Sequence, residues 1–208
     1  MKDEILQTAL RQFLKYGIRK MSIKKLVDPL GISTKTVYKY FKNKEELLEA
    51  VLRLHYTQQY QLLENHSADQ NVVSLIIDIW YMAIEGEYSV NSKFFYDLHY
   101  YYPEVERKTE AVRGQIIWKK IGQIVKKGIK EGLFKKDIYP VVAMEGIAVL
   151  YTAVARTREF KRFHLSPHEI FLNTIVLYIR GLCTRKGIRQ LDKHISTLEP
   201  SGGIRSVK

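Results

Sequence analysis

The sequence predicts an all-α protein with a small N-terminal three-helix domain and a larger C-terminal helical domain. Apolar residues recur at helical spacing along nearly the whole chain, and alternating β-branched runs are few. Glycines and prolines fall where helices would begin or end. The length of 208 residues accommodates one small and one medium domain. We place the boundaries at residues 1–48 and 49–190, followed by a tail over residues 191–208.

A helix-turn-helix is predicted from Ser22 onward. Ser22 is positioned to cap the first helix of the motif, and Gly31 can adopt the positive φ that a tight turn needs. Ser33 is the expected cap of the second helix. In that helix Val37 and Phe41 are four residues apart, so they share one buried face. This outline is that of a motif that reads DNA.

The flanks of the motif carry two further local signals. Pro29 falls inside the first helix and removes a backbone donor, so we expect this helix to end early or to bend at Asp28. Asn43 can cap a third helix, and Glu46 three residues later would complete a capping box.

The faces of the motif that are not needed for packing offer hydroxyl, lysine and tyrosine side chains. Residues 34–36 stand at the N-terminal end of the second helix, where a recognition helix touches base edges. Residues 38–40 are better placed for phosphate oxygens, and Lys44 lies at a helix N-terminus that attracts a phosphate. The candidate DNA-contacting residues are Ser22, Ser33, Thr34, Lys35, Thr36, Tyr38, Lys39, Tyr40 and Lys44.

The charge of the chain supports a polyanionic partner. The formal net charge is +12, and residues 1–44 hold 11 Lys and Arg against 3 Asp and Glu, which is +8 of that total. Charge this localised is the electrostatic footprint of a nucleic-acid-binding domain. A membrane surface is the competing polyanion, but no apolar run approaches a spanning length. We therefore expect double-stranded DNA and no membrane, with an ordinary helical corner bearing a solvated basic face as the structural alternative.

Two stretches around this motif resemble the DNA-binding domain of the TetR (tetracycline-repressor-like) family. In residues 5–17 an alanine, a phenylalanine and a closing glycine recur at the family's offsets. Residues 36–48 carry its tyrosine, aromatic and phenylalanine followed by lysine, glutamate and leucine. The resemblance implies that Tyr38 and Lys44 bind the DNA backbone and that residues 34–36 face the bases.

The C-terminal domain is expected to be helical throughout. Ser166 and Pro167 open its last helix with a capping box and a first-position proline. Residues 65–71 are polar and indicate a loop, and the tail beyond residue 190 is expected to be loosely docked or disordered. Helices are expected over residues 45–64, 72–86, 87–102, 103–132, 140–158 and 166–187.

Aromatic residues are concentrated in the first part of this domain. Residues 80–102 contain nine of the chain's 24 aromatic residues. Apolar cavities edged by a few polar groups are typical of small-molecule sites, and the resemblance implies an effector pocket here. Filling of the core is the alternative for each residue. Candidate residues for a pocket that takes a small apolar or aromatic effector are Trp80, Tyr81, Tyr88, Phe95, Tyr96, His99, Trp118, Ile121 and Met144.

Four acidic residues lie in or beside the aromatic cluster. A solvated surface position is expected for each of them, although a buried one could select a cationic ligand. These residues are Asp78, Glu85, Glu87 and Asp97.

The last two predicted helices are apolar on more than one face. A helix that is apolar all round must be buried on all sides, and a partner subunit would cover it economically. Burial within a monomer is the alternative. The resemblance implies a homodimer with a four-helix interface that presents two recognition helices to a palindromic operator. Candidate interface residues are Ile147, Leu150, Phe171, Ile175, Tyr178 and Leu182.

Catalysis has little support. The histidines have no carboxylate or cysteine at ligand spacing, so no metal site is predicted. No glycine-rich phosphate loop or nucleophile motif appears, and we expect no cofactor and no enzymatic activity. Cys183, the chain's one cysteine, lies in an apolar run and is expected to be a buried structural thiol. The charged N-terminus predicts no signal peptide and a cytoplasmic location.

These observations predict a sequence-specific transcriptional regulator, expected to be a ligand-responsive repressor that acts as a homodimer. The helix over residues 45–64 is the expected lever between effector and DNA. Two alternatives stay open. One is an architectural or cell-division DNA-binding protein on the same scaffold, without an effector. The other is an enzyme that the basic head targets to DNA, in which case convergent titratable groups should occupy the C-terminal domain.

Overall fold

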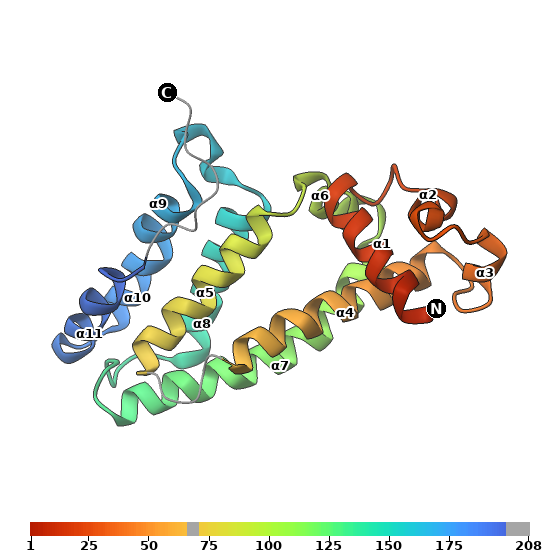
Figure 1. The fold of residues 1–208 in the computed structure, drawn as a ribbon. Coiled ribbons are helices and arrows are strands. Elements are labelled where there is room, and N and C mark those ends of the chain that lie inside the picture. Colours follow the sequence, from red (N-terminus) through yellow and green to blue (C-terminus); the bar gives the residue numbers. More distant parts are fainter. Residues whose placement is uncertain (66–70, 199–208) are drawn as a thin grey trace. The chain divides into compact units, whose positions relative to one another are not determined.

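The computed structural model describes residues 1–65 and 71–198, and this part of the chain is helical throughout (Figure 1). Within it no β-strand forms, and Phe134 and Cys183 make an isolated antiparallel bridge. The all-α prediction is therefore confirmed. Most of the predicted loop at 65–71 and the end of the predicted tail lie outside the described residues. None of the described helices is long and apolar enough to cross a bilayer.

The chain forms two compact units. Unit 1 comprises Met1–Leu62 and Ser89–Ile116, and unit 2 comprises Leu63–Tyr88 and the chain from Ile117 onward. One boundary between the units falls within the long helix α4 (Lys44–Asn65), and another falls within α7 (Pro103–Lys130). This grouping differs from the sequence-based division after residue 48, because most of α4 and the segment 89–116 pack with the N-terminal helices.

Unit 1 is built on a closely packed apolar core. Phe13 of the first helix, Leu26, Leu47 and Phe94 are each fully buried in it. Burying a large apolar side chain contributes roughly 1.5–3 kcal/mol, so this core fixes the helices that carry the candidate DNA contacts. Besides α4 and the first part of α7, unit 1 contains α1 (Lys2–Tyr16), α2 (Ile23–Val27), η1 (Asp28–Leu30), α3 (Thr34–Tyr38) and α6 (Ser92–Tyr101).

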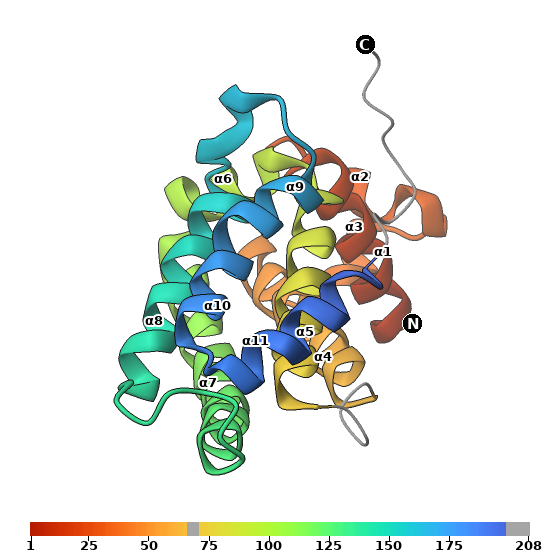
Figure 2. The same ribbon diagram turned by 90° about the vertical axis from the view of Figure 1, so that its left-hand side faces the viewer.

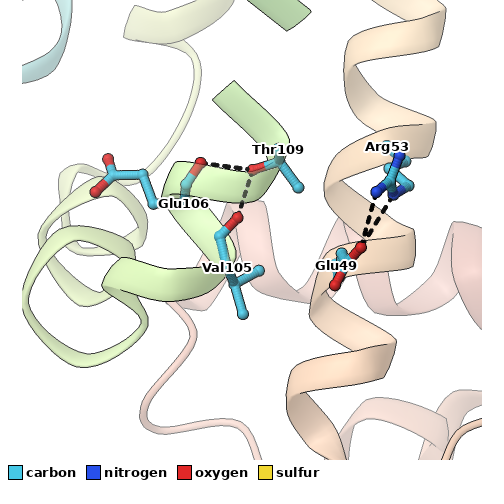
Figure 3. Close-up of polar contacts among 5 residues, drawn as sticks. All are labelled: Glu49, Arg53, Val105, Glu106 and Thr109. Carbon is cyan, nitrogen blue, oxygen red and sulfur yellow. Dashed lines mark hydrogen bonds and ion pairs between the residues drawn. The ribbon is translucent and has the colours of Figure 1, made fainter. Parts of the chain in front are cut away.

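Polar side chains on α4 and on α7 find their partners within their own helix (Figure 3). Arg53 donates to Glu49 on the same face of α4 at 2.9 Å, an i,i+4 pair with glutamate on the N-terminal side. Thr109 is buried in α7, and its hydroxyl donates to the carbonyl oxygens of Val105 and Glu106 at 2.8 and 3.0 Å. Thr109 therefore needs no partner from another helix.

In unit 2 the helix α5 (Val72–Tyr88) is the most enclosed element. It is buried along most of its length and contacts α9, α11 and η2. Figure 2 shows α8 beside the continuous turns of α9, η4 and α10, with α11 crossing in front of α5. Besides α5 and the second part of α7, unit 2 contains α8 (Pro140–Tyr151), η2 (Thr152–Arg156), η3 (Glu159–Phe163), α9 (Pro167–Phe171), η4 (Leu172–Val176), α10 (Leu177–Leu182) and α11 (Arg185–Ile195).

The last predicted helix is interrupted. Its capping box forms at Ser166 as expected, but the helix ends at Cys183, whose backbone is extended. Thr184 then starts α11: its hydroxyl donates to the Gly132 carbonyl oxygen at 2.7 Å and accepts from the Gly187 amide at 3.2 Å. The predicted tail therefore begins inside a helix, in which Leu191 is fully buried.

The predicted helix over residues 140–158 also changes character before its end. After Tyr151 the backbone widens into the π-helical turn η2, and Arg158 closes it in a left-handed conformation with φ of 54°. Such turns are rare in proteins and concentrate at functional sites.

Candidate nucleic-acid interface

The first helix of the helix-turn-helix is short, as its sequence predicts. Ser22 accepts a hydrogen bond from the Lys25 amide at 3.3 Å and so caps α2. The α-helix ends at Val27, and Pro29 lies in the 3₁₀ turn η1 that follows. Gly31 then adopts a left-handed conformation with φ of 64° and ψ of 20°. The early end at the proline and the glycine turn are both confirmed.

The second helix, α3, is held by one cap and one apolar face. The Ser33 hydroxyl accepts from the Thr36 amide at 3.3 Å. Val37 and Phe41 are buried in unit 1, as their spacing predicts. Ile32 of the turn packs against the same core. The rest of α3 is thereby turned outward.

Most of the predicted contact residues in α3 and at the two positions after it lie at the surface. Lys35, Tyr38, Lys39 and Tyr40 are exposed, and Tyr38 presents 54% of its surface to solvent. Residues 34 and 36 are half-buried at the start of the helix. Residues 34–40 thus form one short helix and the turn after it, and their contacts with bases and phosphates stay a prediction.

Lys44 is more constrained than the sequence suggests. Its ammonium donates to the Ile18 carbonyl oxygen at 2.7 Å and lies near the rings of Phe13 and Tyr102. Burial lowers the pKa of Lys44, and the nearby Asp97 carboxylate partly offsets this effect. The contact of Lys44 with a DNA phosphate stays a prediction.

The start of α4 is capped in a variant of the predicted arrangement. Asn43 accepts from the Glu46 amide at 2.8 Å, as expected. The Glu46 carboxylate, however, accepts from the Lys42 amide at 2.7 Å, where a capping box would use the amide of Asn43. The carboxylate still satisfies a free amide at this helix start.

Residues 5–51, which span this whole arrangement, match the model of the bacterial regulatory proteins of the tetR family. The chain belongs to the TetR family. As a TetR-family transcriptional regulator it binds DNA, and the helix-turn-helix described above is the element that this function uses.

The proteins that match this chain over most of its length are distant in sequence. The HTH-type transcriptional repressor KstR2 of Mycolicibacterium smegmatis is 24% identical over 147 residues, which cover 66% of this chain and 69% of that protein. A TetR transcription regulator from Haloarcula marismortui superposes with a TM-score of 0.73 at 18% identity, covering 88% of this chain and 98% of that one. A transcriptional regulator from Saccharomonospora viridis, solved in complex with choline, gives 0.74 at 17% identity with the same coverage.

Sequence reasoning missed the residue that anchors the entrance to the helix-turn-helix of this TetR-family chain. Asp97 of α6 is 8% exposed, and its Oδ2 accepts from the amides of Ile18 and Arg19 at 2.8 and 2.7 Å. The expectation of a solvated surface position is therefore wrong for Asp97. Gly17 makes room for it, since a Cβ there would lie 3.0 Å from the same oxygen.

A second residue of the same segment supports this anchor. The Asn91 amide group donates to the Lys15 carbonyl oxygen at 3.0 Å, and its backbone amide donates to Leu14 at 2.9 Å. Asn91 also caps α6 by accepting from the Lys93 amide at 3.0 Å. The end of α1 is thus tied to the start of α6.

The residues of the predicted effector pocket are divided between the two units. Phe95 is buried in the core of unit 1, Tyr96 is 55% exposed, and His99 is exposed and paired with Glu106 at 3.1 Å. These three residues belong to unit 1, and the other six predicted pocket residues belong to unit 2. Helix α6 packs its apolar face into the core of unit 1 and exposes its tyrosines to solvent, which explains the different burial of these residues.

The remaining predicted pocket residues lie in the core of unit 2. Trp80 packs on Tyr151 with ring centroids 5.5 Å apart, and Tyr81 packs on Phe171 at 5.2 Å. Among them Glu87 is also buried, which again contradicts the expectation of a solvated carboxylate. The buried members of the predicted set are Trp80, Tyr81, Ile121 and Met144, and the half-buried members are Tyr88 and Trp118.

The predicted dimer residues need a similar correction. Ile147, Phe171 and Ile175 are covered by the chain's own helices, so their side chains are not available to a partner. They lie in the C-terminal core, where α9 packs against α5 and η4 packs against α8. Leu150, Tyr178 and Leu182 are half-buried. The exposed apolar residues on the two helices are Val141, Val142, Val149 and Leu177.

Cys183 is a buried thiol, as predicted, with 2% of its surface exposed. Burial raises its pKa to about 11. Since the thiolate is the reactive form, this TetR-family protein has a cysteine that is poorly suited to redox sensing. Among residues 1–65 and 71–198, no three His, Cys, Asp or Glu side chains gather as metal ligands would.

Proposed function

We propose that this TetR-family regulator is a ligand-responsive repressor that binds a palindromic operator as a homodimer. The observation that carries the proposal is the short capped helix α3, which together with the turn after it exposes Lys35, Tyr38, Lys39 and Tyr40. The similarity to the repressor KstR2 supports repression as the direction of control. The localised positive charge supports a duplex as the partner.

Exposed apolar side chains support the homodimer. Val142 and Val149 are seven residues apart on α8, hence on one face, and are 67% and 64% exposed. Leu177 on α10 is 56% exposed, and α8 packs against the neighbouring turn η4. A twofold contact through this face would present two recognition helices about one DNA turn apart, or a multiple of it.

A response to a ligand would be a shift between two states of the dimer. An effector that binds one state more tightly favours it, and DNA release follows if that state spaces the heads incorrectly. Support comes from the buried polar groups among the aromatic residues of unit 2. The Saccharomonospora viridis neighbour holds choline, so this fold is able to take up a small molecule.

The decisive experiment is selection of bound sequences from random duplex DNA by the purified chain at near-physiological salt. A specific dimer enriches a palindrome with fixed half-site spacing. Uniform recovery of DNA, falling steeply as salt rises, would refute the operator proposal and favour an architectural DNA-binding protein.

Alanine variants of Lys35, in α3, and Lys39, just after it, should distinguish a residue that reads bases from one that contacts phosphates. Lys35→Ala is expected to relax the selected sequence at one position of each half-site, because residue 35 stands at the end of the helix that meets the bases. Lys39→Ala should weaken binding to all sequences alike and lower the slope of log affinity against log salt by about 1 per head. Equal loss of selectivity in both variants would contradict the assignment.

A charge in the proposed dimer face should separate the subunits without unfolding them. Val149→Glu is expected to give a monomer in analytical ultracentrifugation at micromolar concentration, since the partner would bury an unpaired carboxylate. Circular dichroism should stay unchanged, because the side chain is 64% exposed within its own chain. Tyr139→Glu, at a 78% exposed position before α8, is the control and should leave the dimer intact. A dimeric Val149→Glu variant would exclude this face.

A further inference from the structure

A carboxylate without full compensation is buried in unit 2. Glu87 of α5 is 1% exposed; its Oε1 accepts from the Tyr151 hydroxyl at 2.7 Å and lies 3.7 Å from Nε of Arg156. Its Oε2 is enclosed and meets no hydrogen-bond donor among the residues that the structure describes. A buried charged oxygen is costly without a donor, so each such atom indicates an absent partner or a function.

A buried hydrogen-bond donor without an acceptor, the indole of Trp80, lies on the same side of α5 as Glu87. Trp80 precedes Glu87 by seven residues, which places both on one face about 10 Å apart along the helix axis. Trp80 is 7% exposed, and its indole Nε1 meets no acceptor within the described part of the chain. The Tyr151 ring lies against Trp80 and its hydroxyl reaches Glu87, so the two groups border one patch.

The backbone opposite this patch is irregular. The π-helical turn η2 contacts α5 and carries Arg156 toward Glu87. Arg158, in its left-handed conformation, donates to the Glu87 carbonyl oxygen at 3.2 Å and lies over the Tyr88 ring at 4.9 Å. A π-turn and a left-handed arginine each cost free energy, and such strain is retained where it serves a site.

We propose that the buried patch between α5 and η2, bordered by Glu87, Trp80 and Tyr151, binds a neutral, elongated molecule with a hydroxyl or N–H donor for Glu87 and a carbonyl or ether acceptor for Trp80. An apolar, flat middle part packs against the rings of Trp80 and Tyr151. This names the chemistry of the effector, and it rests on the ligand response proposed above.

The charges around Glu87 select a neutral ligand over a charged one. Arg156 already accompanies the carboxylate at 3.7 Å, so a cationic ligand at Oε2 would face a guanidinium across the same group. An anionic group cannot donate a hydrogen bond to Oε2 and would place a second negative charge against it, next to the one that Arg156 already accompanies. A neutral donor satisfies Oε2 at no such cost.

The test uses the full chain without DNA and titrates it calorimetrically with 4-(4-hydroxyphenyl)butan-2-one, which has a hydroxyl donor, a ring and a ketone acceptor. We expect saturable binding with one site per chain. Removing the hydroxyl, in 4-phenylbutan-2-one, or the ketone, in 4-butylphenol, should weaken binding about tenfold each, the loss expected for one hydrogen bond to a buried partner. Tyramine and 3-(4-hydroxyphenyl)propanoate, which are charged, should bind more weakly than the neutral probe. Tighter binding of either charged analogue, or no binding by the neutral series, overturns the proposal.

Two variants locate the binding. Trp80→Phe keeps a ring and removes the indole donor. This variant should therefore bind 4-(4-hydroxyphenyl)butan-2-one and the ketone-free 4-butylphenol with equal affinity. Ile76→Val removes one buried methyl group from the same helix and touches no polar group, so it should keep the full ketone effect. An unchanged ketone effect in Trp80→Phe contradicts the proposal even if Glu87 variants fail to fold.

Binding and DNA release are then measured separately. If the probe binds as described but leaves the selected operator bound, the site stands and the ligand-responsive repressor is refuted. If the chain selects a palindrome and no neutral probe binds, the DNA-binding proposal stands and the site is refuted.

Discussion

Replacing Asp97 by alanine is expected to lower the free energy of unfolding and to weaken DNA binding. The Asp97 carboxylate accepts the amides of Ile18 and Arg19 at 2.8 and 2.7 Å in a buried position. Alanine leaves both donors without this acceptor, and at about 1–3 kcal/mol for each such group the loss is roughly 2–6 kcal/mol. Because native domains are stable by only about 5–15 kcal/mol, this is a large fraction of the total.

DNA binding is affected because of where the two amides lie. Ile18 and Arg19 lead from α1 into α2, so the Asp97 carboxylate fixes the backbone that orients the helix-turn-helix. Urea denaturation followed by circular dichroism measures the stability loss, and titration of labelled operator DNA measures the affinity. Asp97→Asn is the matched control, since its amide oxygen can accept both hydrogen bonds. Wild-type stability of the alanine variant would show that water replaces the carboxylate without cost.

The parts of the fold that sequence predicted well are those encoded within a few residues. Ser22 and Ser33 cap their helices by bonding to amides three residues away. Gly31 adopts its positive φ because of its own missing Cβ, and Pro29 ends the α-helix through its own missing N–H. Such effects need no knowledge of the tertiary structure. The exposed face of α3 follows from them, once Val37 and Phe41 are assigned to the core.

The parts that sequence did not predict depend on contacts between distant residues. Asp97 meets its partners 79 and 78 residues away, and nothing local distinguishes it from a surface aspartate. The break at Cys183 likewise depends on Thr184, whose hydroxyl bonds to a carbonyl 52 residues earlier. Hydrophobic pattern also could not separate Ile147, buried in its own chain, from the exposed Val149 two residues later. A helix that is apolar all round does not indicate which face its own domain covers.

Replacing Gly187 by alanine is expected to be the most damaging single-methyl change in unit 2. A Cβ at this position would lie 2.1 Å from the Leu133 carbonyl oxygen and 3.1 Å from Cβ of Cys183. The Leu133 oxygen is backbone and already accepts from the Thr184 amide at 2.9 Å, so it has little freedom to move away. Overpacking usually costs about 1–3 kcal/mol, and a clash with fixed backbone belongs at or above the upper end.

Gly181→Ala, six residues earlier, is the matched control with the opposite expected sign. Gly181 lies in α10, and no atom is within 4 Å of a Cβ built on it. Alanine there should raise stability by up to about 1 kcal/mol, because it lowers the conformational entropy of the unfolded chain and favours helix. Guanidinium denaturation of both variants at one protein concentration measures the two changes, with concentration fixed because dimerisation would add to stability. A stable Gly187→Ala variant would mean that the start of α11 can move away from Leu133, and that the Thr184 cap, rather than this close approach, holds the helix in place.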